Sequence, residues 1–439
     1  MNGAWTAIAG RAAWPRAWRL ARYRRPGWAL ADQCVVSACN FLTIYLFART
    51  MSTPAFGAFM IAHTGLMLLT SMQGALIVQP HNVLAAPLEG ASYRRFTAAL
   101  GVAQVLFTAA LCAALAAAAA IVWALGATGA GVVMLALAAA AFPWLAQEFV
   151  RRVLYTHGET RAAFANDALT YGLQLAGALA AVIWLGGGAD ARAAFVVLGA
   201  SSLAGAAAGL WQLRGHLQWN GGWLRALIAW KEAWDFGKWL SAQNLLAWMG
   251  THGHAWVVGI MLGAEQVGLY RAATHLTNVI NPVRQAAFNY LPSRGSKVRH
   301  SDGQAGLSRW MRRTFWFLLL APLPVALPLM LFPGPILSLA YGDRYSGPEL
   351  ALILALATLA QLVTFVKFTF DLGLLALRGT KSIFYVHLIP VALLFTTGIG
   401  LVYAFGIVGV PLSGLLIGVA VLAATAVAYR RLAKAQEAG

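Results

Sequence analysis

The stretch WQLRGHLQWNGGWLRALIAWKEAWDFGKWL, residues 211–240, divides the chain into two hydrophobic halves of similar length. Its indole rings favour the boundary between headgroups and hydrocarbon, and its cations favour anionic headgroups. Gly221 and Gly222 interrupt the pattern, which predicts a short surface helix with a flexible lead-in. An ordinary interfacial linker is sufficient to explain it. The tryptophans and cations are Trp211, Trp219, Trp223, Trp230, Trp234, Trp239, Arg214, Arg225, Lys231 and Lys238.

The composition on either side of this stretch is that of a membrane protein. Of the 439 residues, 60% are hydrophobic and 10% are charged, whereas soluble domains carry about 25% charged residues. Apolar runs of about 20 residues recur along the chain and predict a polytopic membrane protein. The net charge of +18 could suggest nucleic acid. However, the basic residues recur at the ends of every second apolar run, so we expect no nucleic-acid partner.

The sequence predicts no cofactor, metal or disulfide framework. Cys34, Cys39 and Cys112 all lie within apolar runs, and no CxxC spacing occurs. At the N-terminus, arginines and prolines precede the first apolar run, a pattern unlike that of a cleavable signal. We therefore expect residues 1–27 to form a basic amphipathic helix on the cytoplasmic membrane surface.

The fold class predicted from the apolar runs is all-α, with twelve transmembrane helices in two six-helix bundles. The expected bundles are residues 28–213 and 236–432, joined by a Trp/Arg-rich interfacial linker at 214–235 and followed by a cytoplasmic tail at 433–439. The expected spans, within a few residues, are about 28–49, 55–80, 95–124, 130–156, 162–186, 191–213, 236–262, 266–292, 310–332, 348–377, 382–404 and 407–430.

Lysine and arginine are distributed unequally between the two sides of the predicted membrane. One side collects the N-terminal arginines, Arg94 and Arg95, the cations of the central stretch and most later ones. The other side has only Arg49, Arg192, Arg271 and Arg344. Positive charge is retained on the cytoplasmic side, so we expect both termini there.

A weak internal repeat relates the two halves. Asp32-Gln33 precedes MSTPAFGAF at 51–59, and Gln243-Asn244 precedes LGAEQVGLY at 262–270 by the same interval. A chance match remains an alternative. A true repeat implies two bundles related by an axis along the membrane normal, with a cavity between them that opens to either side.

Several short motifs then resemble one family. They are DQCVVSACNF at 32–41, FGKWLS at 236–241, VGIMLG at 258–263, VGLYRAA at 267–273, YGDRY at 341–345, LLALRG at 374–379 and FGIVG at 405–409. In order and spacing they resemble the O-antigen and exopolysaccharide flippases of the multidrug/oligosaccharidyl-lipid/polysaccharide exporter superfamily, over essentially the whole chain. The departures are Arg271, where such proteins often have a small residue, and the Trp-rich centre.

The resemblance implies a MATE-like exporter fold and a transport function. The implied substrate is an oligosaccharide on undecaprenyl pyrophosphate, moved by alternating access from the cytoplasmic to the periplasmic leaflet of a bacterial inner membrane for O-antigen or exopolysaccharide synthesis. The implied partners are this polyprenyl-pyrophosphate-linked glycan, the phospholipid bilayer, and the polymerase and other proteins of polysaccharide assembly.

Such a substrate needs a wet cavity lined by cations and hydrogen-bonding groups, because charge is costly in hydrocarbon. Lys367 is the strongest candidate, since it lies deep within a predicted span. One helical face carries Thr364, Lys367, Asp371 and Arg378. This face is either a polar stripe toward the cavity, with Lys367 meeting the pyrophosphate, or a self-neutralising Lys367–Asp371 pair.

The span at 266–292 supplies the next candidates. Arg271, His275 and Asn278 share one face, and Asn281-Pro282 interrupts the helix. Arg284 lies on a different face unless the proline re-aims it. The alternative for Arg271 is that its side chain snorkels to the outer interface.

Two further polar faces complete the candidate sugar or anion site. One lies at 243–256 and the other on the first span, and hydrogen bonding between helices or packing histidines are the alternatives. The candidates are Asn244, Thr251, His252, Gln33, Ser37 and Asn40, with His63 and His254 as packing or titrating histidines. The acids Asp32, Glu148, Asp167 and Asp235 lie near cytoplasmic ends beside cations, which indicates interfacial charge balance.

Two other functions fit parts of the sequence. A multidrug or cation antiporter of the same fold needs carboxylates in its cavity, whereas this chain has deep cations. A membrane polymerase or ligase of polysaccharide assembly needs catalytic acids or a large outer loop, and the longest outer loop, 332–348, carries few charges. No Walker motif or nucleophile–base set appears, so we expect no enzymatic activity.

Overall fold

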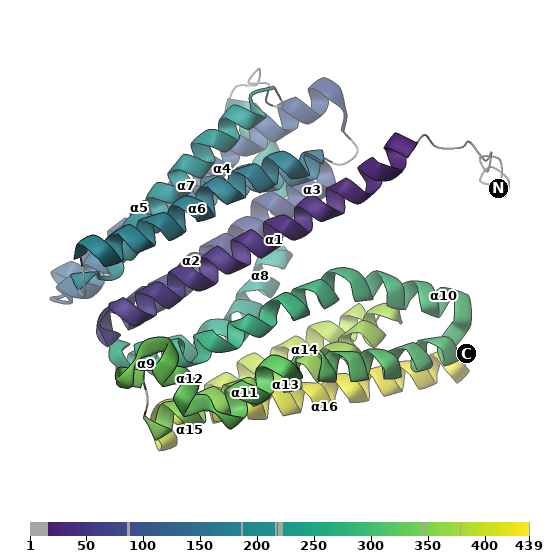
Figure 1. The fold of residues 1–439 in the computed structure, drawn as a ribbon. Helices are drawn as coiled ribbons and strands as arrows, with labels where there is room; N and C mark the ends of the chain where they lie inside the picture. Colours follow the sequence, from purple (N-terminus) through teal and green to yellow (C-terminus); the bar gives the residue numbers. More distant parts are fainter. Residues whose placement is uncertain are drawn as a thin grey trace.

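The computed structural model describes residues 16–85, 88–185, 188–215, 217, 223–345, 347–377 and 379–438. Nearly all of these residues are helical, and none of them forms a strand. This confirms the all-α fold class. Figure 1 shows two groups of helices, α1 to α7 and α9 to α16, with α8 crossing behind them.

The first bundle is built from α1 (Arg16–Thr50), α2 (Thr53–Gln73), a π-helical turn η1 (Gly74–Val78), α3 (Gln79–Leu84), α4 (Gly90–Ala124), α5 (Thr128–His157), α6 (Thr160–Leu185) and α7 (Ala191–Leu213). Small residues let its helices approach closely. A Cβ on Gly209 of α7 would lie 2.1 Å from Val150 of α5, and one on Gly205 would lie 1.9 Å from Thr170 of α6. Close backbone approach of this kind is typical of helix packing in membranes.

The second bundle contains α8 (Trp223–Leu262), α9 (Ala264–His275), the 3₁₀ segment η3 (Leu276–Ile280), α10 (Asn281–Leu320), α11 (Leu323–Leu331), α12 (Pro333–Tyr341), η4 (Asp343–Tyr345), α13 (Pro348–Ala376), α14 (Thr380–Leu393), the π-helical turn η5 (Leu394–Gly398), α15 (Ile399–Phe405), η6 (Gly406–Val408) and α16 (Gly409–Ala438). Within α10 the chain turns at Gly303, where φ is 65°, and runs back (Figure 1).

The helices agree with the expected twelve spans. By length and composition, nine helical stretches of the described chain are apolar enough to cross a membrane, and a pair bent by 42°, Lys297–Leu320 with Leu323–Leu331, makes ten. One of the nine, Ser382–Ala435, is a hairpin in which α14 and α15 pack against α16. The remaining transmembrane span consists of α9, η3 and the start of α10. This span is more polar than the others, and its α-helical structure is interrupted at Leu276–Ile280.

Helix α8 differs from the sequence-based expectation. It begins at Trp223, inside the segment 214–235 assigned to a linker, and continues without a break to Leu262. Its buried face consists of Ala226, Ala229 and Ala233, and a Cβ on Gly237 would lie 2.4 Å from the Ala75 carbonyl oxygen. This small-residue face packs on the first bundle and stabilises one continuous helix. Trp230 packs on the same bundle, against Phe107 of α4, whereas Trp234 and Trp239 are exposed.

The two bundles are joined at one end of the molecule. We call the side with most lysines and arginines the basic side and the other the opposite side. On the opposite side, Gly57 of α2 and Gly268 of α9 allow backbone contact: a Cβ on Gly57 would lie 1.7 Å from the Ala264 carbonyl oxygen, and one on Gly268 would lie 2.2 Å from that of Thr53. These are the two glycines of the internal repeat.

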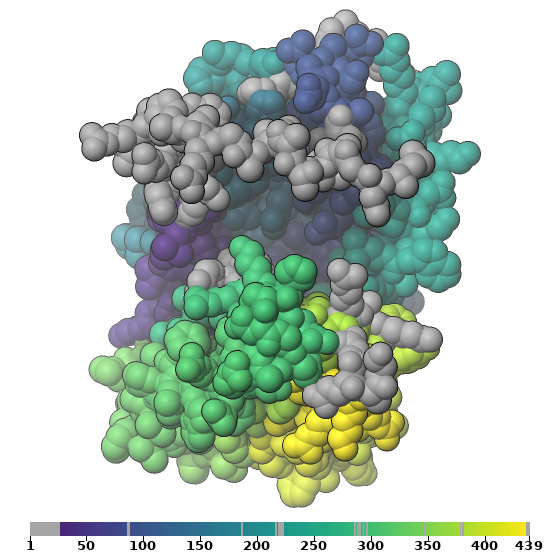
Figure 2. All heavy atoms as spheres, turned by 90° about the vertical axis from the view of Figure 1, so that its right-hand side faces the viewer, coloured from purple at the N-terminus to yellow at the C-terminus, as the bar shows by residue number. Residues whose placement is uncertain are grey.

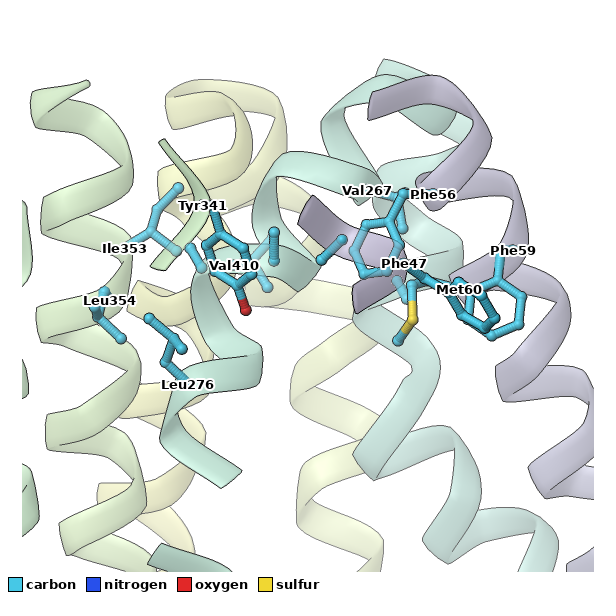
Figure 3. Packing of buried hydrophobic residues seen from close by; sticks show 14 of the residues in the cluster. Phe47, Phe56, Phe59, Met60, Val267, Leu276, Tyr341, Ile353, Leu354 and Val410 are labelled. Carbon is cyan, nitrogen blue, oxygen red and sulfur yellow. The ribbon is translucent and has the colours of Figure 1, made fainter. Parts of the chain in front are cut away.

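A single hydrophobic core continues across this junction. Phe47, Phe56 and Phe59 of the first bundle pack in the same cluster as Val267 and Leu354 of the second (Figure 3). Toward the basic side the bundles diverge. Figure 2 looks onto that side and shows a recess between the first bundle, above, and the second bundle, below.

Candidate functional site

A cavity of about 500 Å³ lies within the second bundle. Helices α8, α9, α13, α14 and α16 and the segment η3 form its walls, and Met60 of α2 is its contribution from the first bundle. Six predicted site residues line it: Thr251, Arg271, His275, Asn278, Thr364 and Lys367. Lining residues that the prediction of the site omitted include His254, Tyr270, Gln361 and His387.

Arg271 is the cation that distinguishes this cavity. Its Nε is buried without a hydrogen-bond partner, and its guanidinium lies 5.8 Å from the centre of the Tyr270 ring. Within the described part of the chain, no carboxylate forms an ion pair with it. A half-buried cation with an unpaired Nε and no counterion is unfavourable, so the position favours an anionic ligand.

Histidines surround Arg271. Its charge acts on His63, His252, His254 and His275. Two of these line the cavity and are held by hydrogen bonds: His254 Nε2 lies 2.9 Å from Ser413 Oγ, and His275 Nε2 lies 3.1 Å from the Phe41 carbonyl oxygen. A carbonyl oxygen only accepts, so His275 Nε2 is the donor and its Nδ1 accepts from Asn278 Nδ2 at 3.2 Å.

Lys367 forms the predicted ion pair with Asp371 and also lines the cavity. Its Nζ lies 2.8 Å from Asp371 Oδ2, one helical turn away, with the two side chains 17% and 18% exposed. Lys367 also lines the cavity, whereas Asp371 is not among the lining residues. The hydroxyl of Thr364 lines the cavity and donates to the Ala360 carbonyl of its own helix at 3.1 Å. Arg378 lies outside the described residues.

The other predicted candidates do not line the cavity. Arg284 of α10 is exposed and is not among the lining residues. Asn244 donates to the Ser71 carbonyl at 3.0 Å, and the His252 ring lies 5.9 Å from that of Trp248. On α1, Gln33 donates to Ser37 at 3.0 Å, and Asn40 accepts from Gln174 at 3.1 Å. Asn244 and Asn40 thus take part in hydrogen bonds between helices, whereas Gln33 and Ser37 bond to each other within α1.

A second polar cluster, in the first bundle, is more buried than the sequence suggested. Arg151 of α5 pairs with Asp32 of α1 at 3.1 Å and with Asp167 of α6, and the two carboxylates are 1% and 0% exposed. Tyr155 donates to Asp32 at 2.5 Å, and Gln147 donates to Asp167 at 3.0 Å. These acids therefore join three helices instead of balancing charge at the interface. Because the partners lie far apart along the chain, the sequence alone does not reveal that they pair.

The fold is shared with solved transporters. An inward-facing multidrug resistance MATE family transporter of the MOP superfamily is 16% identical, with 92% of this chain and 95% of that chain covered and a TM-score of 0.69. The lipid II flippase MurJ, in an inward closed conformation, is 13% identical over 91% of this chain and 86% of that chain, also at 0.69. The Vibrio cholerae MATE transporter VcmN in its bent form is 14% identical over 93% and 96%, at 0.59. These neighbours are transporters and flippases, not enzymes.

Sequence comparison gives the family. No curated protein matches the chain. A family model described as polysaccharide biosynthesis protein matches residues 96–348, more than half of the chain. This match and the helical architecture agree with the resemblance seen in the motifs. The chain is a multi-pass membrane protein that belongs to the polysaccharide biosynthesis protein family, with the fold of the multidrug/oligosaccharidyl-lipid/polysaccharide exporter superfamily.

Proposed function

We propose that the protein is a flippase that moves an oligosaccharide linked to undecaprenyl pyrophosphate from the cytoplasmic to the periplasmic leaflet of a bacterial inner membrane. The family match to polysaccharide biosynthesis proteins supports a saccharide substrate. The solved neighbours with this fold include a protein named as a lipid II flippase, which supports transport of a lipid-linked molecule.

The observation that carries the proposal is the cation-lined cavity around Arg271 and Lys367. Charge in a bilayer of about 30 Å hydrocarbon thickness costs several kcal/mol per group unless it is compensated. The cavity supplies two cations together with the hydroxyl, amide and imidazole groups of Thr251, Asn278 and His387. Such groups compensate a phosphate and bind sugar hydroxyls while the polyprenyl tail stays in the bilayer.

The arrangement of the bundles supports loading from the cytoplasm. The basic side faces the cytoplasm by the positive-inside rule, which places both termini there. The bundles meet on the opposite side, where Gly57 and Gly268 allow backbone contact. The recess between them lies on the basic side (Figure 2). A head group therefore enters from the inner leaflet, and release requires the opposite side to open.

A multidrug or cation antiporter is the alternative with the same fold. Cationic substrates are held by carboxylates, and the lining residues of the cavity include none. An integral-membrane polymerase or ligase has less support, because the solved neighbours are transporters and flippases. The cavity chemistry therefore favours an anionic substrate.

The test is translocation by the purified full-length protein in vesicles. A fluorescent oligosaccharide on undecaprenyl pyrophosphate is placed in one leaflet, and its arrival in the other is followed with an impermeant quencher. We expect Arg271→Ala to reduce the initial rate at least about tenfold, a loss of about 1.4 kcal/mol. The matched control Arg192→Ala removes an exposed arginine far from the cavity and keeps the rate. Translocation no faster than in protein-free vesicles refutes the proposal.

A further inference from the structure

The arm of α10 that follows the turn at Gly303 packs on the second bundle with one side only (Figure 1). The residues that it buries there are Leu307, Met311, Thr314 and Leu318. Their spacing of three or four residues places them on a single side of the helix. The other side of this arm therefore faces away from the bundle.

This outward side changes from charged to apolar along the helix axis. Three arginines come first, two aromatic residues follow about one turn later, and a leucine comes last. The exposed residues are, in order, Arg309, Arg312, Arg313, Trp316, Phe317 and Leu320. Side chains three or four residues apart are neighbours on a helix, so the six form one continuous surface, which we call the α10 outer face.

The α10 outer face lies at the membrane boundary on the basic side. Its helix continues through the bent pair Lys297–Leu320 and Leu323–Leu331, which is apolar enough to cross a bilayer. From Arg312 to Leu331 the helix is about 28 Å long, close to the hydrocarbon thickness of about 30 Å. The arginines therefore lie at the level of the lipid head groups, and the aromatic rings lie just inside them.

The three arginines carry positive charge that the described part of the chain does not neutralise. They take part in none of its ion pairs. The sequence contains no acidic residue between Asp302 and Asp343. The end of α16 adds further cations, because Ala433 packs in one cluster with Leu307 and Met311 of α10. The exposed cations of that end are Arg430, Arg431 and Lys434.

We propose that the α10 outer face binds an anionic phospholipid of the leaflet on the basic side. The phosphate lies on the three arginines, because a guanidinium presents a planar fork that matches phosphate oxygens. The glycerol region lies beside Trp316, since indole rings favour that depth, and the acyl chains follow Phe317 and Leu320. None of these residues lines the cavity, so the site is separate from the transport path.

A lipid fits this surface better than an acidic protein does. An acidic protein would match the arginines, but the exposed aromatic and aliphatic groups directly below them lie within the bilayer. A phospholipid presents its anionic, interfacial and apolar parts in the same order as the α10 outer face.

Native mass spectrometry of the full-length protein in detergent tests the site. The probes are phosphatidylglycerol, phosphatidylethanolamine with the same acyl chains, and glycerol phosphate. We expect phosphatidylglycerol to bind at least about tenfold tighter than the zwitterionic lipid, because each basic side chain near a membrane surface adds to the attraction of anionic lipid. The triple variant Arg309→Gln/Arg312→Gln/Arg313→Gln should abolish this preference. Trp316→Ala should weaken both lipids equally, since both contain the glycerol region.

A matched triple variant separates a defined site from diffuse charge. Arg94→Gln/Arg95→Gln/Lys231→Gln removes three exposed cations of the basic side on α4 and α8, with the same change in net charge. This control should keep the preference for phosphatidylglycerol. Equal loss of preference in the two triple variants would overturn the proposal, because the attraction would then come from the overall charge of that side.

Two other results would also overturn the lipid site. One is glycerol phosphate that binds as tightly as phosphatidylglycerol, because the arginines would then form a site for free phosphate. The other is an unchanged lipid preference in the α10 triple variant, which would leave its arginines available to an acidic protein partner. An unchanged elution profile and unfolding temperature show that each variant is folded.

Discussion

Arg344 of η4 donates a hydrogen bond from Nη1 to the carbonyl oxygen of Met51, at the end of α1, across 2.8 Å. The two residues belong to different bundles. The last carbonyls of a helix have no partner within it, and a cation at that end is favourable. Tyr345 adds a second contact of this kind, from its hydroxyl to the Ala48 carbonyl at 3.2 Å. The second bundle thus caps a helix of the first and closes the opposite side.

Removal of this cap should open the opposite side. We expect Arg344→Ala to increase labelling of a cysteine placed at Thr53 by an impermeant maleimide, in a background in which Cys34, Cys39 and Cys112 are replaced by alanine. Tyr345→Phe keeps the buried ring and loses one hydrogen bond worth about 1 kcal/mol, so its effect should be smaller. Equal labelling of Arg344→Ala and the parent protein contradicts a sealing role.

The close contact between α2 and α9 at Gly57 predicts a steric effect on the opposite side. Gly57→Ala places a methyl group 1.7 Å from the Ala264 carbonyl oxygen, so α2 and α9 must separate. Overpacking costs typically about 1–3 kcal/mol, and we expect a lower unfolding temperature together with increased labelling at Thr53. Gly65→Ala is the matched control in the same helix, because its Cβ would meet Leu137 at an ordinary 3.6 Å. If the two variants have the same unfolding temperature and the same labelling at Thr53, the close contact at Gly57 is not what holds α2 and α9 together.

The sequence predicted those features that depend on one helix at a time. Apolar length gave the twelve spans, and spacing of three or four residues placed Arg271, His275 and Asn278 on the face that lines the cavity. Lys367 and Thr364 reach the same cavity by the same spacing on α13. Local periodicity fixes such faces, because they depend only on residues within one helix.

Features that depend on pairs of distant helices were not predictable. Asp32 and Arg151 are 119 residues apart, and only the packing of α1 on α5 and α6 brings them together. The location of the cavity inside the second bundle depends in the same way on how α8, α9, α13, α14 and α16 converge. The long helix α8 was missed because tryptophan and lysine suggested an interface, whereas its alanine face packs on the first bundle.

The Lys367–Asp371 pair predicts different effects on folding and on transport. Removing one partner of a partly buried pair leaves an uncompensated charge, so Lys367→Gln should lower the unfolding temperature. The double variant Lys367→Gln with Asp371→Asn removes both charges at similar volume and should recover most of that loss. Transport should not recover, because the cavity still lacks one of its two cations. Recovered transport in the double variant would falsify an anion-binding role for Lys367. The role of Lys367 would then be limited to its ion pair with Asp371.

The buried network around Arg151 predicts a structural effect without an effect on binding. Arg151→Gln leaves Asp32 and Asp167 without their cation at 1% and 0% exposure, and breaking a buried pair costs about 3–5 kcal/mol. We expect a large fall in the unfolding temperature in detergent, whereas Arg152→Gln, at a neighbouring and 46% exposed arginine, should change it little. The folded fraction of Arg151→Gln should still bind inorganic pyrophosphate with wild-type affinity, since the network belongs to the first bundle and the cavity to the second. A loss of affinity at unchanged stability would instead connect this network to the substrate site.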